Sequence, residues 1–208
     1  MKITNYSELL KIKNINPQGA PGFHGDLMLI DTVDECLNNS VNFIETGTNM
    51  GNTLYFVSRN YSIKSYSCEV HNQTPEGVIN YNDIVFNNTP SPNFIYDIVE
   101  KNQSLLEQTC TFWLDAHFGG GEDILFEEIK YIVNNFQSYY AFCDDVDINN
   151  NLFSHNGYGI EKIKKLLPSN LKLYVPNYSL QTSEFHKLTG WCFFTTENIT
   201  NQNYIKLI

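Results

Sequence analysis

Residues 43–53 read FIETGTNMGNT and decide the fold of this chain. The stretch begins within an apolar run, passes through the acidic Glu45 and turns at Gly47 and Gly51. It continues into LYFVSRNY, whose apolar residues have helical spacing, so the order predicted is strand, glycine turn, helix. In an open α/β sheet such a turn lies where the topology switches direction and ligands bind. We expect glycine at position 47 because the backbone has to bend there and approach the ligand without a Cβ.

The glycine spacing of this turn bears on the kind of ligand. A dinucleotide site usually has GxGxxG, in which an additional glycine lets the backbone approach a pyrophosphate. This chain has only GxxxG, formed by Gly47 and Gly51. The pattern favours a nucleoside ligand without a pyrophosphate, and Glu45 ahead of the turn suits a cationic group of that ligand. A glycine turn that binds nothing is the alternative.

Composition restricts the class of protein and of partner. With 208 residues, 42% of them hydrophobic, the chain can form one large globular domain with a full core. The formal net charge of -10 argues against a nucleic-acid partner, whose phosphates would be repelled. No apolar run is long enough for a membrane span or a signal peptide, so we expect a soluble, cytoplasmic protein. Five scattered cysteines are expected to be buried free thiols: Cys36, Cys68, Cys110, Cys143 and Cys192.

Helical and strand patterns alternate along the chain, which predicts a doubly wound, parallel α/β sheet. Residues 1–25 are expected to form an N-terminal arm, either a surface arm or a lid, and residues 26–208 a single domain. Helices are expected over 26–37, 74–87, 124–136 and 159–167, with a short helix beginning in 101–108. Strands are expected over 41–44, 65–70, 94–99, 111–114, 171–176 and 190–197, with one more from Tyr139 that ends at Asp144 and Asp145.

An acidic residue stands at the end of the expected second strand. Glu69 follows Gly47 by 22 positions, close to the offset of about 20 at which an acidic side chain accepts hydrogen bonds from ribose hydroxyls. The turn and this acid therefore favour the same nucleoside site.

Three aspartates follow two neighbouring strands of the expected sheet. Asp115 follows one strand, and Asp144 and Asp145 follow the next, so all three emerge at the edge that carries the Gly47 turn. Carboxylates this close would raise one another's pKa unless a cation lay between them. A hard divalent ion such as Mg²⁺ would relieve the repulsion and leave positions for a substrate diol. The alternative is that these aspartates cap the loops that follow them.

His117 lies two residues after Asp115. It is a candidate general base on a substrate hydroxyl because an imidazole titrates near neutral pH, and it could equally orient a carboxylate. Asp115 and His117 are therefore the candidate catalytic residues. The other histidines, His24, His71, His155 and His186, are expected at the surface.

On these residues the sequence resembles the class I S-adenosylmethionine-dependent methyltransferases. FIETGTNMGNT resembles their first motif and Glu69 their ribose-binding acid. With Asp115, Asp144 and Asp145 the chain is similar to the divalent-metal-dependent O-methyltransferases, and the resemblance covers roughly residues 42–147. It implies a Rossmann-like methyltransferase fold with a mostly parallel, seven-stranded sheet and one antiparallel strand near the C-terminus. The lysine base of the catechol enzymes is absent here, where His117 and a run of glycines stand instead.

The resemblance also implies a set of roles. Asn102 and Gln103 would lie near the adenine, Glu45 and the backbone of residues 47–49 near the methionine part, and Asp115, Asp144 and Asp145 would hold Mg²⁺. The cofactor-binding residues that it implies are Glu45, Gly47, Thr48, Asn49, Gly51, Thr53, Glu69, Asn102, Gln103 and Asp115.

The expected reaction is methyl transfer from S-adenosylmethionine to a hydroxyl of a small molecule or sugar. Two other functions are open from the sequence. A nicotinamide-dependent oxidoreductase could use Glu69 for its ribose, although the glycine pattern argues against it. A non-catalytic protein could keep the same fold for binding or assembly.

Overall fold

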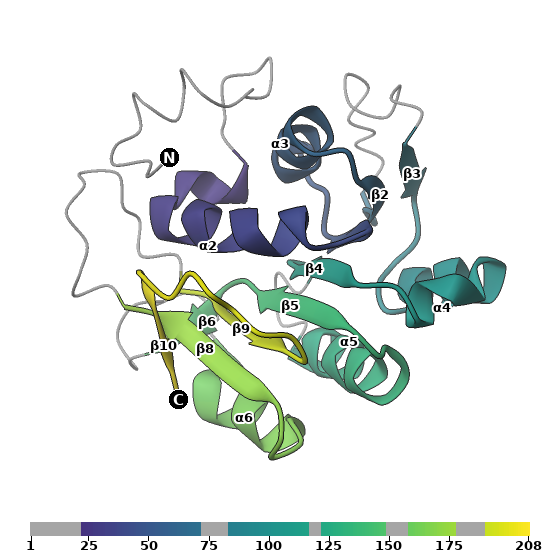
Figure 1. Ribbon diagram of the computed structural model, residues 1–208. Coiled ribbons are helices and arrows are strands. Elements are labelled where there is room, and N and C mark those ends of the chain that lie inside the picture. Colours follow the sequence, from purple (N-terminus) through teal and green to yellow (C-terminus); the bar gives the residue numbers. More distant parts are fainter. Residues whose placement is uncertain (1–21, 72–82, 117–121, 149–157, 178–189) are drawn as a thin grey trace.

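The computed structural model describes residues 22–71, 83–116, 122–148, 158–177 and 190–208 (Figure 1). Residues 1–21, and with them most of the expected arm, lie outside the described ranges. Within those ranges, no helix is both long enough and apolar enough to span a bilayer.

One large sheet forms the centre of the molecule (Figure 1). It has eight strands in the order β10-β8-β9-β5-β4-β1-β2-β3, and β6 pairs with β7 in a separate two-stranded ladder. The bounds are β1 Asn42–Thr46, β2 Lys64–Cys68, β3 Ile84–Asn87, β4 Cys110–Leu114, β5 Tyr139–Cys143, β6 Val146–Asp147, β7 Tyr158–Gly159, β8 Lys172–Pro176, β9 Cys192–Thr195 and β10 Ile205–Leu207.

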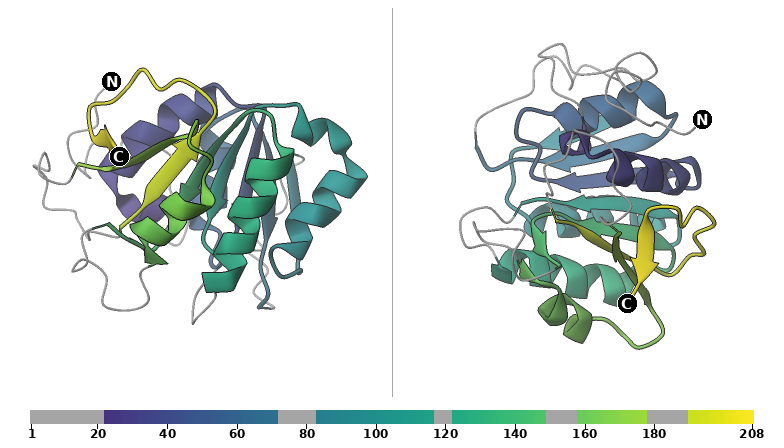
Figure 2. Two further views of the ribbon diagram at one scale, coloured as in Figure 1. Left: turned by 90° about the horizontal axis from the view of Figure 1, so that it is seen from below. Right: turned by 90° about the vertical axis from the view of Figure 1, so that its left-hand side faces the viewer.

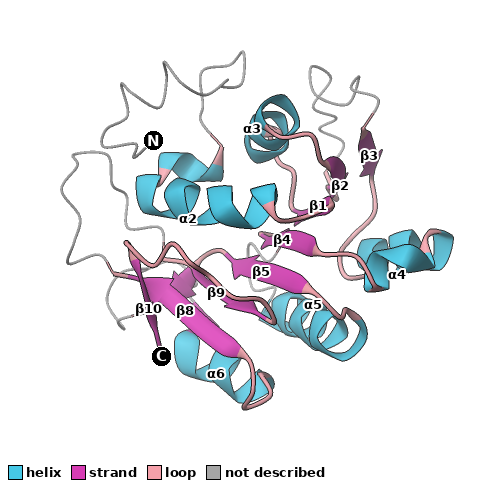
Figure 3. Ribbon diagram, viewed as in Figure 1, coloured by secondary structure: helices cyan, strands magenta, loops and turns pink. Residues whose placement is uncertain are grey.

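Helices cover both faces of the sheet, as Figures 2 and 3 show. The helices α2 and α3 lie with η1 on one face, and α4, α5 and α6 lie on the other (Figure 1). Their bounds are η1 Phe23–Gly25, α2 Leu27–Asn38, α3 Asn52–Asn60, α4 Asn93–Lys101, η2 Gln103–Leu106, α5 Glu122–Asn135 and α6 Ile160–Leu166.

The topology confirms the doubly wound, mostly parallel sheet. Strands β3, β2, β1, β4 and β5 are parallel neighbours, so β4 lies beside β1 and β5 beside β4, as expected. Strand β9 runs antiparallel to β5 and β8. The sheet has one strand more than the seven expected, because the three-residue β10 pairs antiparallel with β8 at the edge. A piece so short leaves no period in the sequence by which it could be recognised.

Two expected elements are wrong, and both lie between β2 and β4. Residues 94–99, expected as a strand, belong to helix α4. Their buried apolar pairs, Phe94 and Ile95 followed by Ile98 and Val99, have the i, i+4 spacing of one helix face. Residues 84–87, expected as the end of a helix, form strand β3 instead. The expected start of that helix at Thr74 lies outside the described ranges.

Strand β1 divides its side chains between the two faces of the sheet, as the pleat requires. Phe43 packs with the cluster under α2 and α3, whereas Ile44 packs with the cluster under α4 and α5. Glu45 and Thr46 continue this alternation at the end of the strand, and both are buried. All five cysteines are buried free thiols, as expected.

Asp26 joins helix α2 to the C-terminal part of the sheet. Its Oδ1 accepts hydrogen bonds from the backbone N–H groups of Met28 and Leu29, at 2.9 and 3.1 Å, and so caps the helix. Its Oδ2 accepts a hydrogen bond of 3.0 Å from the indole N–H of the buried Trp191, directly before β9. One buried carboxylate therefore connects the first turn of α2 to the residue that precedes β9.

Replacing Trp191 by phenylalanine removes this indole donor from Asp26. We expect the free energy of unfolding to fall by about 1.5–3 kcal/mol beyond any packing loss, because a buried carboxylate loses a hydrogen bond. A double-mutant cycle measures the contribution of this hydrogen bond, by urea denaturation of Trp191→Phe, Asp26→Ser and the double variant. Serine at position 26 keeps the helix cap but cannot accept the indole N–H as the aspartate does. An equal cost of Trp191→Phe in both backgrounds would show that the hydrogen bond contributes nothing.

Candidate functional site

A pocket of about 600 Å³ opens at the carboxyl edge of the parallel strands. Its size is that of a small-molecule site. The pocket is lined by His24, by the turn after β1 (Gly47 and Asn49), by residues 68–71 at the end of β2, by residues 89–91 after β3, by residues 115–116 after β4, by Ile124 and by residues 144–145 after β5. The strand ends thus converge where the sequence predicted a ligand.

Gly47 turns the chain directly above the end of β4. Its φ is +86°, a conformation that side chains disfavour, and a Cβ there would lie 2.3 Å from the carbonyl oxygen of Asp115. The N–H groups of Gly47 and Thr48 both donate to the Cys68 carbonyl at 3.0 Å. Glycine is therefore required by the close approach of β4, which the sequence alone did not indicate. The same turn lines the pocket.

Glu69 lies at the end of β2 with its carboxylate held by backbone donors. Oε2 accepts a hydrogen bond of 2.8 Å from the N–H of Asn49, and Oε1 accepts from Val70 and His71 at 2.8 and 3.0 Å. A carboxylate offers about four lone-pair sites, so capacity remains on Oε2 for a ligand hydroxyl. Asn49 has a φ of +46°, and this left-handed conformation brings its N–H to Glu69.

Glu45 and Thr48 lie behind the pocket and do not line it. The Ser67 hydroxyl donates to the Glu45 carboxylate at 2.5 Å, and the Thr48 and Ser67 hydroxyls are also 2.5 Å apart. Burial raises the pKa of Glu45 to about 8, the hydrogen bond from Ser67 opposes this shift, and the charge of Glu69 adds to it. Burial therefore disfavours at Glu45 the negative charge expected beside a cationic ligand.

Thr53 and Gly51 shape the turn without reaching the pocket lining. Gly51 precedes α3 with a φ of +75°. The Thr53 hydroxyl accepts a hydrogen bond of 3.1 Å from the N–H of Phe23, so it ties the end of the N-terminal arm to α3.

Asn102 and Gln103 are not brought to the pocket. They lie between α4 and β4, at the amino edge of the sheet, opposite the pocket, where the Leu106 carbonyl accepts from Gln137 just before β5. The resemblance implied that they lie near an adenine, but the segment before them, residues 94–99, belongs to helix α4 and is not the expected strand. Because that segment is a helix, its end lies at the other edge, and the pocket is lined by residues 89–91 instead.

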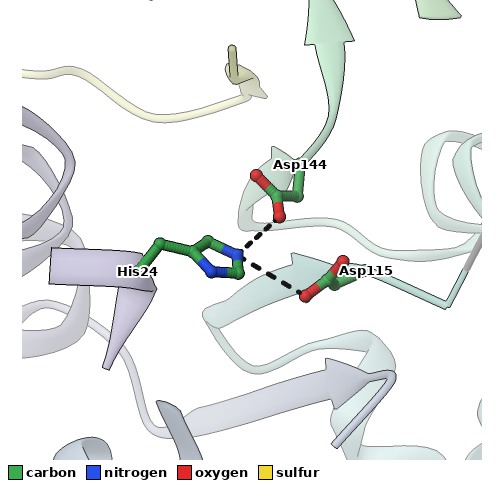
Figure 4. Close-up of side chains that lie close together, drawn as sticks. All are labelled: His24, Asp115 and Asp144. Carbon is green, nitrogen blue, oxygen red and sulfur yellow. Dashed lines mark hydrogen bonds and ion pairs between the residues drawn. The ribbon is translucent and has the colours of Figure 1, made fainter. Parts of the chain in front are cut away.

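The structure brings together His24, Asp115 and Asp144, as Figure 4 shows. His24 Nε2 lies 2.7 Å from Asp144 Oδ2 and 3.8 Å from Asp115 Oδ2. One donor atom from each of the three residues lies within 4.8 Å of the others. Asp145 lines the same pocket but is outside this group, which differs from the expected set of three aspartates. The candidate base His117 lies outside the described ranges.

The acidic groups around this cluster shift one another's titration. The pKa of Asp115 lies well above its usual range because burial and the charges of Asp144, Asp145 and Glu45 disfavour a further negative charge. Burial and the charge of Asp144 raise the pKa of Asp145 to about 6. Withdrawal from water alone would lower the pKa of His24, but the charge and hydrogen bond of Asp144 outweigh it and raise the pKa. A cation between these groups would relieve the repulsion.

His24 is the site residue that sequence reasoning missed, since it was expected at the surface. Its side chain is 45% exposed, yet Nε2 is directed at the two carboxylates (Figure 4). The neighbouring Phe23 is fully buried, with its ring 5.2 Å from that of Trp113 in an edge-to-face contact. Residues 22–25 therefore pack into the domain. The only sequence signal was an aromatic residue close before the capping Asp26.

Behind the loop after β3 lies a second buried carboxyl group. Glu128 of α5 is fully buried, and its Oε1 accepts a hydrogen bond from the hydroxyl of Ser91, which lines the pocket. Burial raises the pKa of Glu128 to about 7, and the hydrogen bond from Ser91 opposes the shift. This carboxyl group thus fixes one wall of the pocket from within the core.

No protein-family model and no curated protein sequence matches the chain. Solved structures do resemble it. An O-methyltransferase from Bacillus cereus in complex with SAH has a TM-score of 0.61 at 12% identity, over 92% of this chain and 90% of that one. A ribosomal protein L11 methylase from Lactobacillus delbrueckii subsp. bulgaricus has a TM-score of 0.51 at 11% identity, over 88% of this chain and 84% of that one. The chain therefore has the Rossmann-like fold of these methyltransferases.

Replacing Gly47 by alanine tests the contact between the turn and β4. We expect the free energy of unfolding to fall by at least about 2 kcal/mol, because the new Cβ would meet the Asp115 carbonyl and the positive φ would be strained. Gly159→Ala is the matched control, since a Cβ there meets nothing within 4 Å. Similar denaturation midpoints for the two variants would contradict the contact.

Glu128 gives the stability of the fold a dependence on pH. Its pKa is about 7 in the folded chain against 4.5 as the ordinary value, so its favourable contribution is complete below pH 4.5 and is lost as the pH rises through 7. Between pH 5 and 8 we expect wild type to lose up to about 3 kcal/mol relative to Glu128→Gln. Denaturation at both pH values measures this difference, with the exposed Glu127→Gln as the control. A pH-independent difference would contradict the shift.

Proposed function

We propose that the protein is an S-adenosylmethionine-dependent methyltransferase that methylates a hydroxyl of a small molecule or sugar, with a divalent metal in the same pocket. The observation that carries this proposal is the Glu69 carboxylate. It lines the pocket beside the Gly47 turn and is already oriented by the N–H of Asn49. The fold shared with the SAH-bound O-methyltransferase supports it.

In this proposal Glu69 accepts a hydrogen bond from a ribose hydroxyl of the cofactor. Its carboxylate is fixed by three backbone donors, so little conformational freedom is lost on binding. The backbone of Gly47 and Asn49 faces the same space, and residues 89–91 form the neighbouring wall for the base. The cofactor supplies the activated methyl group. The task of this chain is to hold the acceptor oxygen in line with it.

Asp115 and the carboxylate of Asp144 form the acceptor end of the proposed site. The donor set of carboxylate oxygens and one imidazole nitrogen fits a divalent ion, and the mutual distances are short enough for one ion to bridge all three. A divalent ion bound there would lower the pKa of an acceptor hydroxyl and fix its position. His117 remains the proposed group for accepting its proton, and Asp115 remains a proposed catalytic residue as a ligand of that ion. Asp145 places a further carboxyl group at this end of the pocket.

Titration calorimetry of S-adenosylhomocysteine into the purified chain tests the cofactor assignment. We expect micromolar binding that weakens by about 10-fold or more in Glu69→Gln, because a charged hydrogen-bond acceptor is lost. Asn102→Ala is expected to bind as wild type does, because Asn102 lies at the opposite edge of the sheet.

Circular dichroism establishes whether each variant is folded, and NADH serves as the competing ligand. Saturable binding of NADH without binding of S-adenosylhomocysteine would replace the proposal by an oxidoreductase. Binding of neither ligand would leave a methyltransferase fold that serves another purpose.

A further inference from the structure

We propose that His24 is the third protein ligand of the metal, with Asp115 and Asp144, and that this set selects a transition-metal ion over Mg²⁺. The inference rests on the proposed function in so far as the metal occupies the acceptor end of that pocket. It assigns a ligand from the N-terminal segment, outside the elements that form the sheet. It also changes the expected ion from Mg²⁺ to one of the class of Mn²⁺, Fe²⁺ and Co²⁺.

The distances between donor atoms agree with a single shared ion. In an octahedral site with bonds of about 2.1 Å, adjacent ligand atoms lie about 3.0 Å apart and opposite ones about 4.2 Å apart. His24 Nε2 is 2.7 Å from Asp144 Oδ2, slightly below the adjacent spacing, and 3.8 Å from Asp115 Oδ2, between the adjacent and opposite spacings, and the three donor atoms all lie within 4.8 Å of one another. The three ligands come from η1 and from the ends of β4 and β5. The remaining positions would face the pocket.

The position of His24 is fixed by anchors on both sides. Phe23 packs edge-to-face against Phe56 and Trp113, with ring centroids 5.7 and 5.2 Å away, and its N–H donates to Thr53. On the other side, Asp26 caps α2 and accepts from Trp191. The imidazole is thus held over the carboxylates by the core itself, and a ligand held in place costs little entropy when an ion binds.

The charges at this point favour a cation over a simple ion pair. One imidazole nitrogen faces two carboxylate oxygens (Figure 4), but an N–H donates along one direction only. Three carboxyl groups, those of Asp115, Asp144 and Asp145, share this end of the pocket with one imidazole, and a single imidazolium could balance only one of them if all were ionised. The described lining of the pocket includes no lysine or arginine. A divalent ion bound by Nε2 and both carboxylates would satisfy all three groups.

The ligand types determine which ion is favoured. Carboxylates bind Mg²⁺ and Mn²⁺ well, whereas an imidazole nitrogen adds affinity for transition ions in the order Mn²⁺ < Fe²⁺ < Co²⁺ and adds little for Mg²⁺. His24 should therefore matter for transition ions and be nearly irrelevant for Mg²⁺. A structural His–Asp pair that binds no ion would show no such difference.

Titration of the chelator-treated, full-length chain with Co²⁺ and with Mg²⁺ tests the assignment, using calorimetry and the visible absorption of bound Co²⁺. We expect wild type to bind Co²⁺ at least 10-fold more tightly than Mg²⁺. His24→Ala should weaken Co²⁺ binding by at least 10-fold and Mg²⁺ binding by less than threefold. His71→Ala is the matched control, because His71 lines the pocket outside the ligand group, and it should leave both affinities unchanged.

A second measurement needs no variant. Electron spin echo spectroscopy of Mn²⁺ bound to wild type should detect a directly coordinated imidazole nitrogen. Absence of that nitrogen signal, equal losses for Co²⁺ and Mg²⁺ in His24→Ala, or no binding of Co²⁺ to wild type would each overturn the proposal.

Binding of S-adenosylhomocysteine to the same samples separates this inference from the proposed function. A chain that binds Co²⁺ through His24 but does not bind S-adenosylhomocysteine would refute the methyltransferase and keep the metal centre. A chain that binds S-adenosylhomocysteine but does not bind Co²⁺ through His24 would refute the metal centre and keep the assigned cofactor.

Discussion

The contact between the turn at Gly47 and the backbone of Asp115 is the constraint on which the rest of the site depends. Because no Cβ separates them, the turn after β1 lies directly on the end of β4. One pocket therefore holds both ends of the site: Glu69, whose carboxylate accepts the N–H of Asn49, and the cluster of Asp115, Asp144 and His24. A bulkier residue at 47 would push apart the nucleoside end and the acidic end, whose closeness the proposed transfer requires.

Much of this arrangement follows from local pattern in the sequence. The alternation of strand and helix patterns predicted the doubly wound sheet. The apolar run into Gly47, the offset of Glu69 and the acids after two expected strands predicted a ligand site at its carboxyl edge. These predictions succeed because strand ends in a parallel sheet meet at one edge whatever their side chains contact. The period of residues 94–99 was misread, and because this segment is helix α4, Asn102 and Gln103, which the resemblance implied near the adenine, lie at the opposite edge of the sheet.

His24 could not be predicted because nothing near it in the sequence describes its environment. Its partners Asp115 and Asp144 lie about 90 and 120 residues away, and its position is set by the burial of Phe23 and by the hydrogen bond that Trp191 donates to Asp26. The raised pKa values of Glu45 and Glu128 could not be predicted for a related reason. Their burial depends on helices that pack across the sheet, and only burial turns an ordinary glutamate into one with a raised pKa.

The charges of the pocket agree with both proposals and disfavour a nicotinamide dinucleotide as the ligand. Its described lining has the carboxyl groups of Glu69, Asp115, Asp144 and Asp145 and no lysine or arginine. A pyrophosphate would be repelled from such a surface, and the turn with Gly47 and Gly51 lacks the additional glycine of GxGxxG that lets the backbone approach it. Cations are attracted instead. The proposed cofactor carries a positive sulfonium, and the proposed metal site would hold a divalent cation. Either positive charge would offset the repulsion between the carboxylates that line the pocket.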